Sequence, residues 1–331
     1  MYQPLVSVVI PVYNMENYIE RCIMNLKQQT YENLQIIIVD DGSKDRTQEI
    51  CCLMSKEEQR IKFFSKSNEG VSTARNYALK HATGEYVTFV DADDIIHERH
   101  IEHLVSLMQS EDVDLAVTRH MEVSAQDTID KKTIKEQDLI KESFTRAEFV
   151  EHLYDEDKYR GYLWNKMFKT SIIREHDIQM PDGINIFEDM VFIYQYARHM
   201  NRVNYGHMIT YYYVQHVESA MKNINQAKFL QSIEAREKII NSAVEEDERF
   251  INITKEKYVT LAIGYIKGKM IKDSYYDKAL LQELVVKSLE YERELKLPYK
   301  YYIQLVLLRY FTSGLKVFLK KCNSCRKGVK R

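Results

Sequence analysis

Apolar segments alternate with helical patterns over the first ninety residues of this 331-residue chain. Each apolar segment is a short run rich in Val, Ile, Leu or Phe, which is typical of a strand buried on both faces of a parallel sheet. The segments are Leu5–Pro11, Leu34–Val39, Ile61–Ser65 and Tyr86–Val90. Helical spacing occurs over Glu16–Gln29, over a segment capped by Ser43 or Asp45 that ends at Met54, and over Val71–Lys80. This alternation predicts an α/β fold with a mostly parallel, doubly wound, Rossmann-like sheet.

A polar cluster follows each predicted strand. The clusters are Pro11–Asn14, Asp40–Ser43, Lys66–Gly70 and Asp91–Asp94. The carboxyl ends of parallel strands lie at one edge of a sheet, and ligands of such sheets bind beyond that edge. Four separate helix caps could produce the same composition, because Asp, Asn and Ser are favoured at helix starts. Since all four clusters fall at the binding edge, the sequence favours a ligand site there.

The last of these clusters places Asp91 and Asp93 one residue apart on a turn. Two carboxylates this close repel each other unless solvent, hydrogen bonds or a cation compensate their charge. Mg²⁺ and Mn²⁺ take carboxylate oxygens, and Mg²⁺ usually retains positions for water and a substrate phosphate. The alternative is that Asp93 or Asp94 caps a helix that begins near Ile95. The turn therefore predicts either a metal–diphosphate site or a helix start.

The composition argues against several classes of protein. Lys and Arg total 47 against 49 Asp and Glu, so nucleic acid is not expected as the main partner. No run of about 18 apolar residues is present, so we expect no membrane-spanning helix. The amino terminus enters a strand by Val6, so we expect no signal peptide and a cytoplasmic protein. One pair, Cys322 and Cys325, is by itself a weak zinc pattern.

The remainder of the chain is less regular. The predicted elements are strands at Leu115–Thr118 and Val203–Val214, helices at Arg146–Tyr154 and Glu188–His199, mixed structure at Leu163–Arg174, and a polar loop or linker at Ala125–Glu142. Beyond Asn225 the pattern is almost wholly helical and amphipathic. Together with the length, these patterns predict about two structural units.

The polar clusters and their surroundings resemble the inverting nucleotide-sugar glycosyltransferases of family 2, which have the GT-A fold. The matching segments are 8–14, 39–45, 68–76, 84–86, 89–94 and 188–189, and the segment 163–169 resembles bacterial polysaccharide-building members. The resemblance fades beyond about residue 220. It implies a GT-A catalytic domain at residues 1–220, with a nucleotide-binding half at 1–120 and an acceptor-binding half at 121–220. Residues 221–331 are then an α-helical region.

The resemblance also implies a UDP-sugar donor. The implied nucleotide-binding residues are Pro11, Tyr13, Asp41, Asn68, Arg75, Asp91 and Ala92. Asp41 would accept a hydrogen bond from the uracil N3–H, which cytosine lacks, and Asp40 would orient the same loop or form an Asx-type turn. Tyr13 offers a flat face to the base, although it could instead pack on the first helix. Arg75 would contact the diphosphate, or pair with Asp91 and hold the acidic turn.

Metal and catalytic roles follow from the same resemblance. Asp93 and His216 would bind Mn²⁺ or Mg²⁺, which would neutralise the leaving diphosphate, although His216 could be a plain surface histidine. Asp94 would hold the turn or a metal-bound water. Asp189 would be the general base that removes the acceptor proton, so that one displacement converts an α-linked donor into a β-linkage. The simpler interpretation of Glu188 and Asp189 is that acidic residues stabilise a helix start.

Four residues are implied for the acceptor. They are Glu188, Trp164, Asn165 and Lys166. Aromatic faces stack on sugar rings, but a Trp beside Leu163 and Met167 could equally belong to the core.

The carboxy-terminal segment is basic. From Lys316 to Arg331 it carries seven Lys or Arg residues and no Asp or Glu, and it follows the aromatic and aliphatic segment Tyr301–Leu319. Such a segment could bind an anionic membrane surface, mediate self-association, or pack as a helix with a solvated tail. Membrane attachment would suit a lipid-linked oligosaccharide acceptor.

These observations predict a metal-dependent inverting glycosyltransferase that uses a UDP-sugar in bacterial cell-surface polysaccharide synthesis. One alternative is a catalytically silent GT-A-like partner of another transferase, which the intact Asp91, Asp93 and Asp189 argue against. Another is a sugar-1-phosphate nucleotidyltransferase. That class would show a Gly-rich loop after the first strand, where this chain has Pro11–Asn14.

Overall fold

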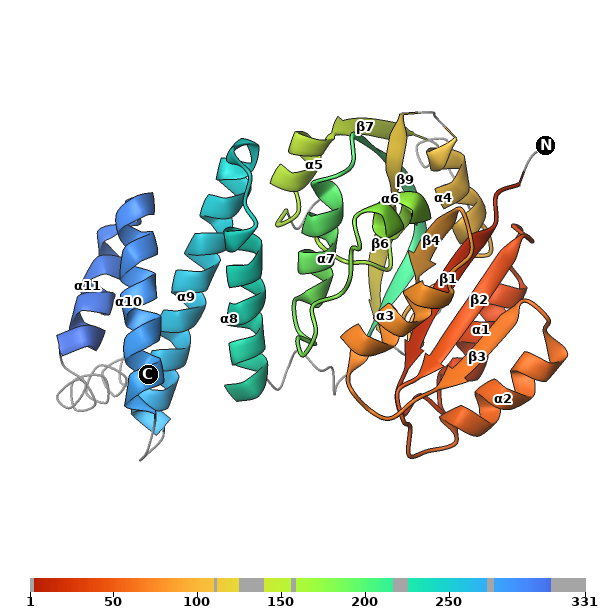
Figure 1. Ribbon diagram of the computed structural model, residues 1–331, viewed down its shortest axis with the longest axis horizontal. Helices are drawn as coiled ribbons and strands as arrows, with labels where there is room; N and C mark the ends of the chain where they lie inside the picture. Colours follow the sequence, from red (N-terminus) through yellow and green to blue (C-terminus); the bar gives the residue numbers. More distant parts are fainter. Residues whose placement is uncertain are drawn as a thin grey trace, which may run out of the picture. The chain divides into compact units, whose positions relative to one another are not determined.

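The computed structural model describes residues 3–109, 112–124, 140–155, 159–216, 226–272 and 277–310. The chain divides into two units, Met1–Gln231 and Ser232–Arg331. The first contains the sheet and the second is helical (Figure 1). The boundary predicted at residues 220–221, and the basic segment beyond Tyr310, lie outside the described residues.

One sheet of nine strands forms from the described residues of the first unit. The strands are β1 (Val6–Val12), β2 (Leu34–Asp40), β3 (Ile61–Ser65), β4 (Tyr86–Phe89), β5 (Ile95–Ile96), β6 (Val113–Ser124), β7 (Lys141–Thr145), β8 (Lys166–Lys169) and β9 (Arg202–Gln215). Their order is β3-β2-β1-β4-β8-β6-β9-β5, and β7 pairs with β9. Strands β3, β2, β1 and β4 are parallel, as their apolar runs predict, whereas β8 is antiparallel to both of its neighbours.

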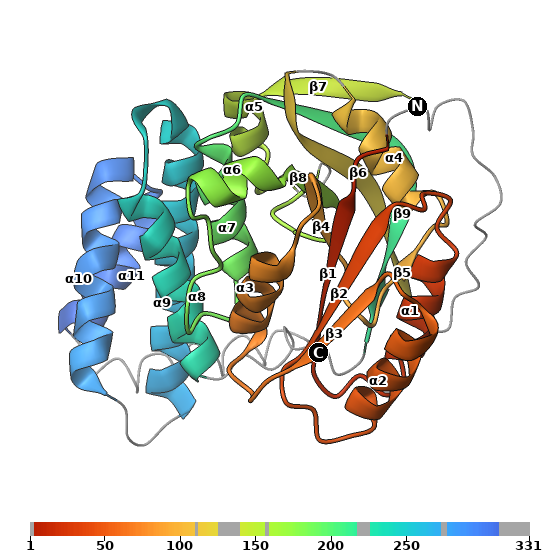
Figure 2. The same ribbon diagram turned by 45° about the vertical axis from the view of Figure 1, so that its right-hand side comes forward.

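Helices cover both faces of this sheet. They are α1 (Ile19–Lys27), α2 (Thr47–Glu57), α3 (Val71–His81), α4 (His100–Met108), α5 (Arg146–Glu151), α6 (Thr170–Glu175) and α7 (Glu188–Ala197). Helix α3 lies on one face of β1–β3, and α1 and α2 lie on the other (Figure 2). Val8 and Ile10 share a core cluster with Ile23 of α1, while Val9 is equally buried outside that cluster. A period of two therefore places β1 between two apolar layers.

Three local predictions need correction. Residues Ile95–Ile96 pair with β9 as a short strand, and α4 begins only at His100, so neither Asp93 nor Asp94 caps a helix. The predicted loop at Ala125–Glu142 ends in β7, a strand whose alternating exposure lacks the apolar run that marks a buried strand. Helix α2 extends to Glu57 and does not end at Met54 as predicted. Of its two predicted caps, Asp45 accepts a hydrogen bond from the Thr47 N–H at 3.0 Å, whereas Ser43 accepts from the Asn14 N–H.

The second unit is built from helices that continue the predicted amphipathic pattern. They are the end of α8 (Gln226–Asn241), α9 (Glu248–Lys272), α10 (Lys278–Leu295) and α11 (Tyr299–Tyr310). The rings of Tyr258 and Tyr291 meet edge to face at 5.2 Å and join α9 to α10. Within the ranges that the structure describes, no helix has the length and apolar character required to cross a bilayer.

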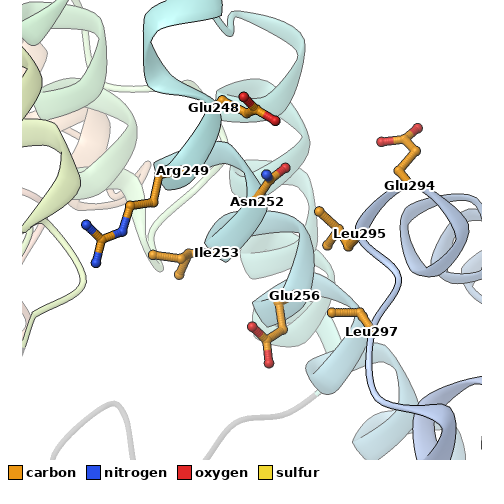
Figure 3. A pocket seen from close by; sticks show the side chains of 8 residues that line it. All are labelled: Glu248, Arg249, Asn252, Ile253, Glu256, Glu294, Leu295 and Leu297. Atoms are coloured by element: carbon orange, nitrogen blue, oxygen red, sulfur yellow. The ribbon is translucent and has the colours of Figure 1, made fainter.

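An open pocket of about 450 Å³ lies in this helical unit (Figure 3). It is lined by the first turns of α9 and by the end of α10, with the residues Glu248, Arg249, Asn252, Ile253, Glu256, Glu294, Leu295 and Leu297. None of the predicted site residues lines it.

Candidate active site

Hydrogen bonds join the polar clusters that follow β1, β2 and β3. The Asp41 N–H donates to the Val12 carbonyl at 2.9 Å, and the Lys66 N–H donates to the Asp40 carbonyl at 2.9 Å. The Asn14 N–H donates to Ser43 Oγ at 2.9 Å. Because these bonds link segments far apart in sequence, the three clusters lie side by side at one edge of the sheet, as predicted.

Both aspartates after β2 organise loops. Asp40 accepts hydrogen bonds from the Ser43 N–H at 3.1 Å and from Ser65 Oγ at 3.0 Å, which confirms the predicted loop-orienting role. Asp41 accepts from Lys66 Nζ at 2.9 Å and from the Gly70 N–H at 2.7 Å, and it is 4% exposed. Its carboxylate therefore holds the loop after β3 against β2. Its contact with uracil stays a prediction.

Gly70 allows the loop after β3 to lie close to the Asn185 side chain. Its φ of +96° lies in the region that favours glycine, and a Cβ there would meet the Asn185 side chain at 2.3 Å. Asn68 is exposed on the same loop, and Tyr13 is 43% exposed after β1. Both side chains are therefore accessible to a ligand at this edge.

Asp94 holds the acidic turn on β9. It accepts a hydrogen bond from the Tyr211 hydroxyl at 2.7 Å and from the Val214 N–H at 2.8 Å. The Asp91 N–H donates to the same Tyr211 hydroxyl at 3.2 Å. Burial, and then the charges of Asp91 and Asp93, raise the pKa of Asp94 well above its usual range. Two roles were predicted for Asp94, and the structure shows that it holds the turn.

Asp93 lies beside His216, with 3.4 Å between Asp93 Oδ2 and His216 Nε2. Arg21 also holds the turn, because its Nη2 donates a hydrogen bond to the Asp93 carbonyl at 2.5 Å. Ala92 is buried between the two carboxylates in the chain, and its contact with the nucleotide stays a prediction. Burial, followed by the charge of Asp91, raises the pKa of Asp93.

The donor set at Asp93 and His216 fits a hard divalent cation with few protein ligands. Among the described residues, no group of three or more His, Cys, Asp or Glu side chains converges as a metal site. Mg²⁺ commonly binds through one or two carboxylates, with substrate phosphate and water in the remaining positions. One carboxylate and one imidazole at this separation are compatible with that arrangement.

Arg75 is the centre of the site. Its Nη1 lies 2.8 Å from Glu188 Oε1 and 2.8 Å from Asp189 Oδ1, and its Nη2 lies 3.2 Å from Asp91 Oδ1. Burial disfavours its charge, but Asp189, Asp91 and Glu188 hold the pKa of the guanidinium above its usual range. The predicted pairing with Asp91 is thus present. The pairing with Glu188 and Asp189, which lie more than a hundred residues away, was missed.

Asp189 begins α7 and faces the loop that precedes β8. The backbone of Leu163 forms a hydrogen bond to its carboxylate. Burial raises the pKa of Asp189, Arg75 opposes the rise and Glu188 adds to it, so that the pKa lies at about 7. A carboxylate with a pKa near neutrality is well suited to accept a proton during a reaction.

Three of the predicted acceptor residues lie inside the protein. Trp164 is almost fully buried, and Asn165 and Lys166 are completely buried. Lys166 Nζ donates to the carbonyls of Arg160 at 2.8 Å and Tyr162 at 2.7 Å, and burial lowers its pKa well below its usual range. Direct contact of Asn165 and Lys166 with an acceptor is therefore corrected to a positioning role for the loop at 159–165.

Tyr211 and Arg21 also belong to the site, although neither was singled out from the sequence. The alternation of tyrosines along β9 indicates that Tyr211 and Tyr213 share one face of the sheet. No local pattern indicates that this face meets the acidic turn, because β9 and that turn are about 120 residues apart.

The sequence profile of glycosyl transferase family 2 matches residues 7–177, which is more than half of the chain. The putative glycosyltransferase EpsH of Bacillus subtilis (strain 168) is 31% identical over 237 residues, or 69% of this chain and 66% of EpsH. Glycosyltransferase GlyA of Streptococcus pneumoniae serotype 4 is 31% identical over 174 residues, or 51% of this chain and 25% of GlyA. The chain thus spans two thirds or less of the length of these curated relatives.

Among solved structures, the chain is similar to residues 1–349 of S. aureus TarS in complex with UDP-GlcNAc. The TM-score is 0.66 at 19% identity, covering 92% of this chain and 87% of the TarS chain. This similarity confirms the predicted α/β GT-A fold with a helical carboxy-terminal region. The profile match, together with the fold, shows that this chain belongs to glycosyl transferase family 2.

Proposed function

We propose that this chain is a metal-dependent inverting glycosyltransferase that moves a sugar from a UDP-sugar to a saccharide or lipid-linked acceptor. The observation that carries the proposal is Arg75, which connects the donor-side Asp91 with Asp189 within 3.2 Å. The complex of the similar TarS chain with UDP-GlcNAc supports a UDP-sugar donor. The resemblance of segment 163–169 to bacterial polysaccharide-building members supports a role in cell-surface polysaccharide synthesis. The proposed product carries a β-linkage.

The donor side of the site would hold the uridine diphosphate at the ends of β1, β2 and β4. The exposed ring of Tyr13 offers a face to the base. Asp41 accepts three hydrogen bonds from the loop after β3, which leaves one lone pair on Oδ2 for the uracil N3–H. Mn²⁺ or Mg²⁺ held by Asp93 and His216 would supply Lewis-acid stabilisation of the leaving diphosphate. Asp91, which accepts a hydrogen bond from Arg75 Nη2, would bind the ribose.

On the acceptor side, Asp189 would take the proton of the attacking hydroxyl. The oxygen attacks the anomeric carbon as the bond to the diphosphate breaks, so the configuration inverts in one step. Arg75 keeps the carboxylate in place at 2.8 Å, and the same Nη1 also orients Glu188. The pKa near 7 lets Asp189 be ionised before the reaction and still take up the proton.

This role predicts a pH dependence. Only ionised Asp189 accepts the proton, and its pKa is raised to about 7. We therefore expect kcat/KM for transfer to rise about tenfold per pH unit below pH 7 and to level off above it, because the ionised fraction follows that course. Transfer rates between pH 5.5 and 9, with UDP affinity measured in parallel, check this. A transfer rate that is flat from pH 5.5 to 8 would contradict the assignment.

The proposed function is tested by a screen of UDP-sugars for Mn²⁺-dependent hydrolysis. At least one UDP-sugar should be hydrolysed, with activity lost in EDTA and restored by Mn²⁺. Asp93→Asn should weaken Mn²⁺-dependent UDP binding by at least about tenfold, since it removes the charged metal ligand. Glu49→Gln on exposed α2 is the matched acidic control and should bind UDP as the wild type does. Absence of both hydrolysis and UDP binding would favour the catalytically silent partner instead.

Two further predictions concern the basic carboxy-terminal segment and the membrane. Membrane attachment or self-association through the basic segment 316–331 concerns residues outside the described ranges. A peripheral position on the inner face of the cell membrane would accord with a lipid-linked acceptor.

A further inference from the structure

A stack of nearly parallel aromatic rings, here called the pile, extends from the core to the surface next to the site. The ring centroids of Trp164 and Tyr211 are 4.4 Å apart, and the two ring planes make an angle of 18°. The centroids of Trp164 and Tyr162 are 4.7 Å apart, with an interplanar angle of 15°. Those of Trp164 and Tyr213 are 5.6 Å apart, with an interplanar angle of 5°. Tyr211 and Trp164 are buried, whereas Tyr162 and Tyr213 are partly exposed. Tyr162 and Tyr213, here called the aromatic platform, are therefore the outer end of the pile.

The aromatic platform is attached to both halves of the candidate active site. The Tyr211 hydroxyl, at the inner end of the pile, bonds to Asp94 and to the Asp91 backbone. Leu163, which stands between Tyr162 and Trp164 in the chain, bonds through its backbone to Asp189. The platform thus belongs to the side of the site where the acceptor proton would be removed, and not to the loops after β1 and β2.

The buried Lys166 side chain holds the platform loop in one conformation. Lys166 Nζ is bonded to the carbonyls on either side of Gly161, those of Arg160 and Tyr162, and also to Asn165 Oδ1 at 2.8 Å. Arg160 has a φ of 44°, which a non-glycine residue rarely adopts without such support. An aromatic surface that is fixed in advance loses little conformational entropy when a ligand stacks on it.

Polar groups surround the exposed rings. Arg160 Nη1 donates to the Tyr162 hydroxyl at 2.8 Å and lies 3.5 Å from Glu122 Oε1. Gln215 Nε2 donates to Glu122 Oε2 at 2.6 Å. Two partly exposed aromatic rings bordered by a guanidinium, a carboxylate and an amide would suit a sugar ring. Such a ring has an apolar C–H face and hydroxyl groups around its edge.

We propose that Tyr162 and Tyr213 form a binding subsite for a sugar ring of the acceptor, with Arg160 and Glu122 binding its hydroxyls. Trp164 supports the platform from below and does not touch the saccharide. The inference rests on the proposed glycosyltransferase function and names the residues that would select its acceptor. It predicts that acceptor affinity depends on these two rings and that donor affinity does not.

Trp164 provides a direct measurement of this binding. It is the single Trp of the chain, so fluorescence excited at wavelengths that tyrosine does not absorb reports on the pile and needs no turnover. The probes are chitotetraose, cellotetraose, maltotetraose and mannotetraose, titrated without donor. We expect at least one tetrasaccharide to change the fluorescence saturably. Tyr213→Ala and Tyr162→Ala should each weaken its binding about tenfold, whereas Tyr213→Phe, which keeps the ring, should stay within about twofold.

Control variants separate the subsite from general packing. Tyr77→Ala removes a half-buried ring from another aromatic cluster, where Tyr77 meets Phe64 at 5.5 Å, and should leave saccharide binding unchanged. UDP affinity by calorimetry should be the same in all variants, which also shows that they are folded. Saccharide affinity that survives both Ala substitutions would overturn the inference, as would wild-type protein that binds UDP but no tetrasaccharide. If the protein neither hydrolyses a UDP-sugar nor binds UDP, the proposed function itself is overturned.

Discussion

Asp189→Asn should lower the rate of sugar transfer by at least about a thousandfold and leave UDP affinity within about twofold of the wild type. An amide has the shape of the carboxylate, and its oxygen can still accept the hydrogen bond that Arg75 donates at 2.8 Å. It cannot take up the proton of the acceptor hydroxyl. The loss therefore falls on the chemical step and spares the contacts that hold the nucleotide.

The matched control is Glu188→Gln. Glu188 shares the same guanidinium at 2.8 Å and begins the same helix, so its replacement changes the local charge by the same amount. We expect this variant to retain transfer within about a hundredfold of the wild type, because Asp189 remains. Transfer is measured with the UDP-sugar found by the hydrolysis screen, and UDP affinity by calorimetry. Normal turnover in Asp189→Asn would refute the assignment of the base.

Arg75→Met should have the largest effect on stability. The substitution leaves Asp91, Glu188 and Asp189 near one another without the guanidinium that lies within 3.2 Å of each. Removing one partner from a buried ion pair typically costs about 3–5 kcal/mol, because the remaining charge is poorly solvated. We expect the free energy of unfolding, measured by urea denaturation at pH 8, to fall by about 3 kcal/mol. Transfer should be lost as well.

The stability loss in Arg75→Met should depend on pH. Burial raises the pKa values of Asp91 and Asp189 and Arg75 lowers them, so without the guanidinium both folded-state values lie further above the unfolded ones. Protonation then favours the folded state, so the destabilisation is largest at pH 8 and shrinks as the pH falls towards 5. Arg46→Met is the control, since Arg46 pairs with Glu49 on an exposed helix surface and should give no measurable change. Equal losses in the two variants would show that the cluster around Arg75 contributes no special stability.

The parts of the fold that the sequence predicts are those with short-range patterns. Strands β1 to β4 are readable because each is a run of apolar residues that ends in a polar turn. Strand β7 was missed because its residues alternate in exposure at an edge of the sheet, where an apolar run is not required. The cap predicted at Asp93 or Asp94 was wrong because pairing of Ile95–Ile96 with β9 overrides the local preference of Asp for a helix start.

Local patterns in the chain suffice to indicate which residues lie at this edge of the sheet, since parallel strands bring the ends of β1, β2 and β4 together whatever their long-range partners. The contacts that these residues make follow from the folded arrangement. Arg75 binds carboxylates 16, 113 and 114 positions away, and Asp94 is bonded to Tyr211 across 117 positions. Lys166, which was predicted to bind the acceptor substrate, is buried and donates a hydrogen bond to the Tyr162 carbonyl of the neighbouring loop. Charge pairing and burial depend on distances in space, and no local pattern in the chain encodes those distances.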